Sequence, residues 1–326
     1  MTYTKKYSLE RFPKTILKPE VVAKHDEHLN ALASDLEKYS SIGYRDLTIF
    51  DWLLRVFENL AISTVKKEYL DSLAVTKTKL AMFVIMVDDT VDNAKKRNFT
   101  LYEQLLKTPF NENAIDTLKL QQEEIKYLQF TEELWSEIHD EIKKYPNYGK
   151  YKDAFEFDLK QVLNSMEYSR FVNTNTNAIN LLENSAYVHH AMIVLMQLDF
   201  DLMCSNGFDD DELGTVRELA YLCQKMARIG NLIGTYPREL IESDMSSEAL
   251  IRFQRDYGKD FKFKINKILN RESRYPKFEE ELIQEWENEY QLAKGIASKI
   301  KSIDTDKFMQ ERQFIQDAYR ILVELY

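Results

Sequence analysis

Three aspartates in the segment Asp88-Asp89-Thr90-Val91-Asp92 have the spacing of ligands for a divalent cation. Residues four apart lie on one side of a helix, so Asp88 and Asp92 project together, with Asp89 beside them. Mg²⁺ prefers oxygen ligands and is often bound by one or two carboxylates together with substrate phosphates. A solvated acidic helix end has the same composition, but the apolar run 80–87 directly before the aspartates favours a functional position.

A second set of oxygen-bearing side chains lies far downstream: Asn231, Thr235 and Glu239. Eight residues are close to two helical turns, so the three side chains form one stripe along a helix. An amide oxygen, a hydroxyl and a carboxylate could together bind one Mg²⁺. Taken alone, the triplet is more typical of a solvent-exposed helix face. The two sets together predict two helical walls that hold several Mg²⁺ ions and bind a diphosphate.

The elements that must position these residues are predicted to be helices. Glycine and proline make up only 8 + 6 = 14 of the 326 residues, which leaves little room for hairpins or an open sheet. Apolar residues recur at three- and four-residue spacing along the chain. We expect one all-α domain over 1–326, with 1–25 as a partly extended N-terminal arm. The expected helices, about ten in number, are 26–40, 47–61, 68–92, 112–145, 149–170, 178–205, 210–243, 246–269, 276–302 and 305–325.

Charge and cysteine content exclude several classes of protein. The net charge is −10 and the pI is near 5.2, and no basic stripe of a nucleic-acid-binding protein is present. An acidic protein that binds a polyanion needs cations between the two, which agrees with a metal site. Two cysteines form neither a disulfide framework nor a zinc site. Because no apolar run approaches the roughly 18 residues that span a membrane, we expect a soluble, cytoplasmic protein without membrane insertion.

The two polar sets resemble the paired metal motifs of class I terpene synthases. Asp88-Asp89-x-x-Asp92 is similar to the first motif, and Asn231-x-x-x-Thr235-x-x-x-Glu239 to the second. Leu232 stands where the family often has aspartate, and Pro237 falls inside the second motif. The resemblance implies a single helical domain around a central apolar cavity. It also implies a lyase: three Mg²⁺ ions, held by those six residues, ionise a prenyl diphosphate, and the carbocation cyclises as diphosphate leaves.

Further substrate contacts are implied by the same resemblance. The segment Leu182-Glu183-Asn184-Ser185 is similar to that of bacterial ent-kaurene-synthase-like enzymes, which implies a C20 substrate, geranylgeranyl or copalyl diphosphate. The family often has a homodimeric assembly. The remaining candidates are an aromatic residue before the aspartates, two arginines near the second motif and a reversed C-terminal Arg-Tyr pair: Phe83, Arg228, Arg238, Tyr319 and Arg320.

Four functions remain open from the sequence. A sesquiterpene synthase acting on farnesyl diphosphate has the same motifs as a diterpene synthase. A chain-elongating trans-prenyltransferase would need a second DDxxD motif, and Asp209-Asp210-Asp211-Glu212 does not complete one because position 213 is leucine. A head-to-head synthase would need two aspartate-rich motifs as well. A helical binding protein without catalysis is the fourth possibility.

Overall fold

The computed structural model describes residues 19–92, 96–110, 114–258 and 276–310. Within these ranges the regular structure is helical, which confirms the all-α prediction, and no helix there is long and apolar enough to cross a membrane. The α-helices are α1 (Pro19–Ala31), α2 (Ala33–Ile42), α3 (Thr48–Phe57), α4 (Leu70–Asp88), α5 (Phe99–Leu105), α6 (Gln122–Ile142), α7 (Tyr148–Thr174), α8 (Leu181–Tyr187), α9 (Val194–Met203), α10 (Leu213–Glu242), α11 (Glu248–Tyr257) and α13 (Pro276–Ala297).

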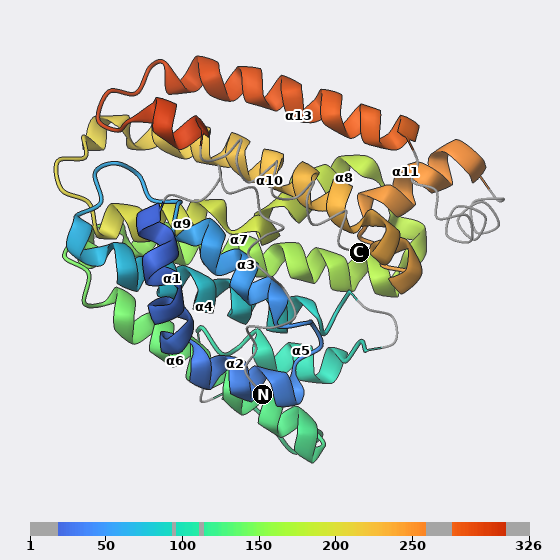
Figure 1. Ribbon diagram of the computed structural model, residues 1–326. Helices are drawn as coiled ribbons and strands as arrows, with labels where there is room; N and C mark the ends of the chain where they lie inside the picture. The colour runs from blue at the N-terminus through green and yellow to red at the C-terminus, as the bar shows by residue number, and fades with distance from the viewer. Residues whose placement is uncertain (1–18, 93–95, 111–113, 259–275, 311–326) are drawn as a thin grey trace.

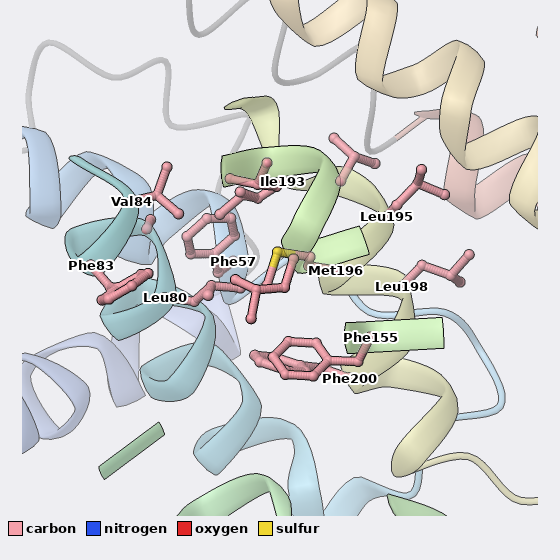
Figure 2. Close-up of a cluster of buried hydrophobic side chains, with 14 of the residues drawn as sticks. Phe57, Leu80, Phe83, Val84, Phe155, Ile193, Leu195, Met196, Leu198 and Phe200 are labelled. Atoms are coloured by element: carbon pink, nitrogen blue, oxygen red, sulfur yellow. The ribbon is translucent and has the colours of Figure 1, made fainter. Parts of the chain in front are cut away.

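Helix α4 occupies the middle of the bundle. Most of its side chains are buried all round, as expected for a helix enclosed by other helices. It packs against α3, α6 and α9, while α7 packs along α9 and α13 lies along the length of α10 (Figure 1). Figure 2 shows where α3, α4 and α9 meet: Phe57, Val84 and Ile193 point toward one another within the largest apolar cluster.

Several helix boundaries differ from the expected ones. Helix α1 begins at Pro19, so residues 19–25 of the expected arm are helical, and residues 1–18 of it lie outside the described residues; proline is well tolerated in the first turn of a helix. The expected helix 26–40 is two helices, α1 and α2. The short helix α5 was not expected; the Asn98 side chain caps it by accepting a hydrogen bond from the backbone N–H of Leu101.

The expected helix 178–205 is interrupted at Ile193. A 3₁₀ turn (η6, Val188–Met192) follows α8, and Ile193 then adopts a left-handed conformation with φ of 53° before α9 begins. This conformation is costly for a β-branched residue, so the surrounding packing must stabilise it. At Ile193, therefore, the packing around the residue determines the backbone conformation, and the local preference for helix does not.

The buried side chain of His25 connects α1 to α3 through hydrogen bonds. His25 Nε2 lies 2.8 Å from Asp51 Oδ1, and its Nδ1 lies 3.0 Å from both oxygens of Glu58. Burial by itself lowers the pKa of His25, but the hydrogen bonds to Asp51 and Glu58 outweigh it and raise the pKa above 6.5. The imidazolium form is therefore the one that binds α1 to the bundle.

This pair of contacts predicts a pH-dependent contribution to stability. Because the folded-state pKa of His25 is raised, its contribution is fully present below pH 6.5 and is lost as the pH rises through the folded-state pKa. We expect the melting temperature of His25→Gln to lie below that of the wild type at about pH 6, and the gap to narrow at about pH 9. A gap that widens with pH, measured by thermal unfolding, would contradict this assignment.

Candidate active site

A cavity of about 200 Å³ opens between α3, α4, α7 and α10. Residues of both sequence motifs line it, so the two polar sets, far apart in the chain, face the same space. Asp88 and Asp92 come from the end of α4, and Asn231 and Glu239 come from α10. The rest of the lining is largely apolar and includes Trp52, Leu53, Val56, Phe57, Leu60, Ala81, Val84, Ile85, Met166, Val188, Met192, Ile193 and Val194.

The first wall is the end of α4 and the turn that follows it. Regular helix ends at Asp88, but the backbone N–H of Asp92 still donates to the Asp88 carbonyl at 3.2 Å, so both side chains remain on the cavity side. Burial raises the pKa of Asp92 well above its usual value, and the nearby carboxylates of Asp244 and Asp88 raise it further. Asp89 Oδ2 and Asp92 Oδ1 are buried without a hydrogen-bond partner in the described part of the chain.

An arginine that the sequence did not single out neutralises part of this wall. Arg45, in the loop between α2 and α3, donates from Nε to Asp89 Oδ1 at 2.5 Å and from a terminal nitrogen to Asp88 Oδ2 at 3.3 Å. Arg45 itself lines the cavity. No local pattern could reveal this contact, because it depends on how the loop folds over the end of α4.

The second wall is a hydrogen-bonded stripe along α10. Thr235 Oγ1 donates to Glu239 Oε1 at 2.7 Å, and Arg228 donates to Asn231 Oδ1 at 3.0 Å and to Glu239 Oε1 at 3.5 Å. The Ser247 hydroxyl donates to the other oxygen of Glu239 at 2.6 Å. Burial raises the pKa of Glu239, but Arg228 and the two hydroxyls lower it more, so the carboxylate stays ionised. Helix α10 runs through Pro237 to Glu242.

A polar bridge joins the segments that follow the two motifs. Arg97 donates to the carbonyl of Asp92 at 2.9 Å and to that of Ser243, beyond the end of α10, at 3.1 Å. Asn173 of α7 donates to the Val91 carbonyl at 3.3 Å and to Asp244 Oδ1 at 3.1 Å. Asp244 also lines the cavity, and burial together with the charge of Glu239 raises its pKa to about 6.

Three of the expected substrate contacts are not among the residues that line this cavity. Phe83 is fully buried against Trp135, with ring centroids 4.9 Å apart. Ser185 is exposed and donates back to the Leu182 carbonyl. Asn184 is buried, and it donates to the backbone of Ser246 at 2.6 Å rather than facing the cavity. Arg228 and Arg238 do line the cavity, whereas Tyr319 and Arg320 lie outside the described residues.

The chain matches no protein-family model, no curated protein and no solved structure. Its function is therefore inferred from the chemistry of this cavity.

The donor set of the cavity fits Mg²⁺ in chemistry. All its ligating atoms are hard oxygens, and Asp92 Oδ1 is buried without a partner among the residues that the structure describes. In that part of the chain no three side chains from His, Cys, Asp and Glu are already arranged around one metal position. Mg²⁺ commonly uses only one or two carboxylates with water and phosphate oxygens. The pair Asp88 and Asp92, and the pair Asn231 and Glu239, suit that coordination.

Arginine side chains are hydrogen-bonded to the carboxylates that would bind a metal. Arg45 donates to Asp88 and Asp89, and Arg228 donates to Glu239. Arg45 should therefore compete with Mg²⁺ for Asp88 and Asp89 and should become available to an anion once the metal has displaced it. In Arg45→Gln we expect Mg²⁺ alone to raise the melting temperature more than in the wild type. We expect inorganic diphosphate, titrated with Mg²⁺ present, to bind about tenfold more weakly.

In Arg45→Gln, Mg²⁺ binding is expected to strengthen while diphosphate binding weakens. A general loss of structure would instead weaken the binding of both ligands. Arg170→Gln is the matched control, because Arg170 pairs with Glu167 on the same helix and is absent from the cavity lining. That control should leave both binding measurements unchanged. Calorimetry that finds Mg²⁺ and diphosphate binding weakened together in Arg45→Gln would disprove the competition.

Proposed function

We propose that the protein is a class I terpene synthase, a lyase that ionises a prenyl diphosphate and cyclises the resulting carbocation. The observation that carries the proposal is the division of one cavity into two regions. Carboxylates and three arginines, Arg45, Arg228 and Arg238, gather where the two motifs meet, and apolar side chains form the remainder. A diphosphate with a long hydrocarbon tail is the class of ligand that matches both regions.

The polar region provides a leaving-group site. Mg²⁺, when bound, neutralises the charge that develops on the diphosphate as the C–O bond breaks. Asp88, Asp89 and Asp92 would hold metal on one wall, and Asn231, Thr235 and Glu239 on the other. Arg228 and Arg238 are positioned to donate hydrogen bonds to the diphosphate oxygens, which are stronger when both groups are charged.

The apolar region suits the hydrocarbon and the cation formed from it. Trp52 and Phe57 of α3 supply aromatic rings to the lining, and the negative face of an aromatic ring attracts a cation. Leu60, Ala81 and Val194 supply aliphatic surface that excludes bulk water. These residues take the part that the sequence had assigned to Phe83.

We favour a C20 substrate, geranylgeranyl or copalyl diphosphate, on the resemblance of the segment around Asn184. In the structure this residue donates to the backbone carbonyl of Ser246, which lines the cavity. Farnesyl diphosphate and a sesquiterpene product are the alternative. The two buried free cysteines, Cys204 and Cys223, agree with a cytoplasmic location, which we propose together with a homodimeric assembly.

A product assay tests the proposal. Purified protein is incubated with geranyl, farnesyl, geranylgeranyl and copalyl diphosphates, with Mg²⁺ or with EDTA, and extracts are analysed by gas chromatography–mass spectrometry. We expect a Mg²⁺-dependent terpene from one of them. Longer diphosphates, formed only after isopentenyl diphosphate is added, would indicate a prenyltransferase instead. The absence of any product would overturn the proposal and favour a helical protein without this activity.

A further inference from the structure

Gln197, in the first turns of α9, places a polar group in the apolar part of the cavity. It is only 4% exposed and lines the cavity. Its side-chain carbonyl Oε1 is buried and has no hydrogen-bond partner among the described residues. Buried carbonyls in native proteins nearly always have a partner, and leaving one unpaired costs free energy. Because Gln197 lies at the cavity wall, the missing donor is expected to come from a molecule inside the cavity.

An ionised diphosphate carries no hydrogen to donate, so it is not that donor. One helical turn before Gln197, Ile193 belongs to the same apolar cluster as Val84 of α4 (Figure 2). One turn after it, Asp201 accepts a hydrogen bond from Lys77 at 2.6 Å. Lys77 precedes Asp88 by eleven residues of α4, or about 16 Å of helix. Along α9, Gln197 therefore lies between Ile193, in the apolar lining, and Asp201, which pairs with Lys77.

Two hydroxyl groups from α7 line the same cavity. Ser165 and Ser169 are four residues apart and so share a face of that helix. Ser165 donates its hydroxyl hydrogen to the Val162 carbonyl at 2.7 Å, which leaves the oxygen free to accept. A buried water needs two to four polar partners. The Gln197 amide and these hydroxyls are polar groups of the cavity lining that can supply them.

We propose that Gln197 binds a water molecule in the deep part of the cavity and that this water ends the reaction by capturing the carbocation. The inference rests on the proposed function. A lone pair of the water oxygen forms a bond to the cationic carbon, and the resulting oxonium loses one proton to the released diphosphate. Prenyl diphosphate and water thus give a terpene alcohol and protonated diphosphate. Gln197 is a positioning residue, because its carbonyl accepts a hydrogen bond from the water and orients the lone pair.

The test compares products made in ¹⁸O-labelled water. We expect wild-type protein with Mg²⁺ to convert its substrate, among farnesyl, geranylgeranyl and copalyl diphosphates, mainly into an alcohol that carries ¹⁸O. Gln197→Met keeps the length of the side chain and removes the acceptor. In this variant we expect the ratio of hydrocarbon to alcohol to rise at least about tenfold, while substrate consumption stays within about threefold of the wild type. Gln197→Leu should shift the ratio in the same direction.

Gln224→Met is the matched control. Gln224 is a buried glutamine of α10 whose Oε1 accepts from the backbone of Leu195 at 3.2 Å, and it is absent from the cavity lining. We expect this variant to lower the melting temperature and to leave the product ratio unchanged. Gln197→Met should lower it less, because the carbonyl that it removes has no protein partner among the described residues, whereas Gln224→Met breaks a bond to the backbone.

Three results would overturn the inference. The wild type could make only hydrocarbon, its alcohol could lack ¹⁸O, or the ratio could stay the same in Gln197→Met; in each case the terpene synthase proposal survives. If no diphosphate gives a product, the proposed function fails and this inference fails with it. The two failures are therefore distinguishable in one experiment.

Discussion

Asp92→Asn and Glu239→Gln are expected to lower turnover about a hundred- to a thousandfold each, and to move the stability of the metal-free protein in opposite directions. Both variants remove one charge from the region that would hold Mg²⁺, so activity falls in both. The folded-state pKa of Asp92 is raised, which means that its ionisation costs stability above that pKa. That of Glu239 is lowered, so its ionised form contributes stability that is present at neutral pH and lost on acidification.

Thermal unfolding without metal at about pH 8 checks the second half of this expectation. Asp92→Asn should melt at the wild-type temperature or above it, and Glu239→Gln should melt below it. Asp210→Asn is the control, because Asp210 belongs to an acidic cluster that pairs with Lys150 at the surface. It should leave turnover unchanged. Turnover of Asp92→Asn or Glu239→Gln within about threefold of the wild type would exclude the assigned metal role.

Lys77→Met is expected to lower the free energy of unfolding by about 3–5 kcal/mol. Lys77 is 1% exposed, and it donates to Asp201 at 2.6 Å and to the Leu60 carbonyl at 2.5 Å. Removing the cation leaves the Asp201 carboxylate buried without its counter-ion. Because Lys77 also binds the carbonyl of Leu60, which lines the cavity, the variant should also disturb that part of the lining.

Denaturant unfolding of a double variant separates the lost charge pair from lost packing. Lys77→Met combined with Asp201→Leu should recover most of the loss, since both charges are then gone and the site becomes apolar. Lys38→Met removes a lysine from an exposed pair with Glu133 and should cost less than about 1 kcal/mol. A double variant no more stable than Lys77→Met would refute the charge explanation.

The sequence predicted the fold class because helical periodicity is local, and it placed Asp88 and Asp92 together for the same reason. The error at Phe83 also has a geometric cause. A helix turns by about 100° per residue, so a residue five positions before Asp88 points away from it. Val84 and Ala81, four and seven positions before Asp88, share its face and do line the cavity.

Other parts of the site depend on contacts that are remote in sequence. Arg45 reaches the aspartates through the fold of a loop, and Asp244 becomes part of the cavity through its bond to Asn173. The left-handed turn at Ile193 has no local signal, because isoleucine is not a residue that normally interrupts helices in this way. Tertiary packing decides each of these features.

The polar bridge of Arg97 and Asn173 has a consequence for the proposed binding of Mg²⁺. Arg97 donates to the backbone on both sides of the cavity, at Asp92 and at Ser243, so a displacement of either segment is transmitted to the other. If each wall binds a metal ion, as proposed, occupancy of one site should change the affinity of the other, and by the same factor in both directions. We then expect a Mg²⁺ binding curve that departs from that of independent sites.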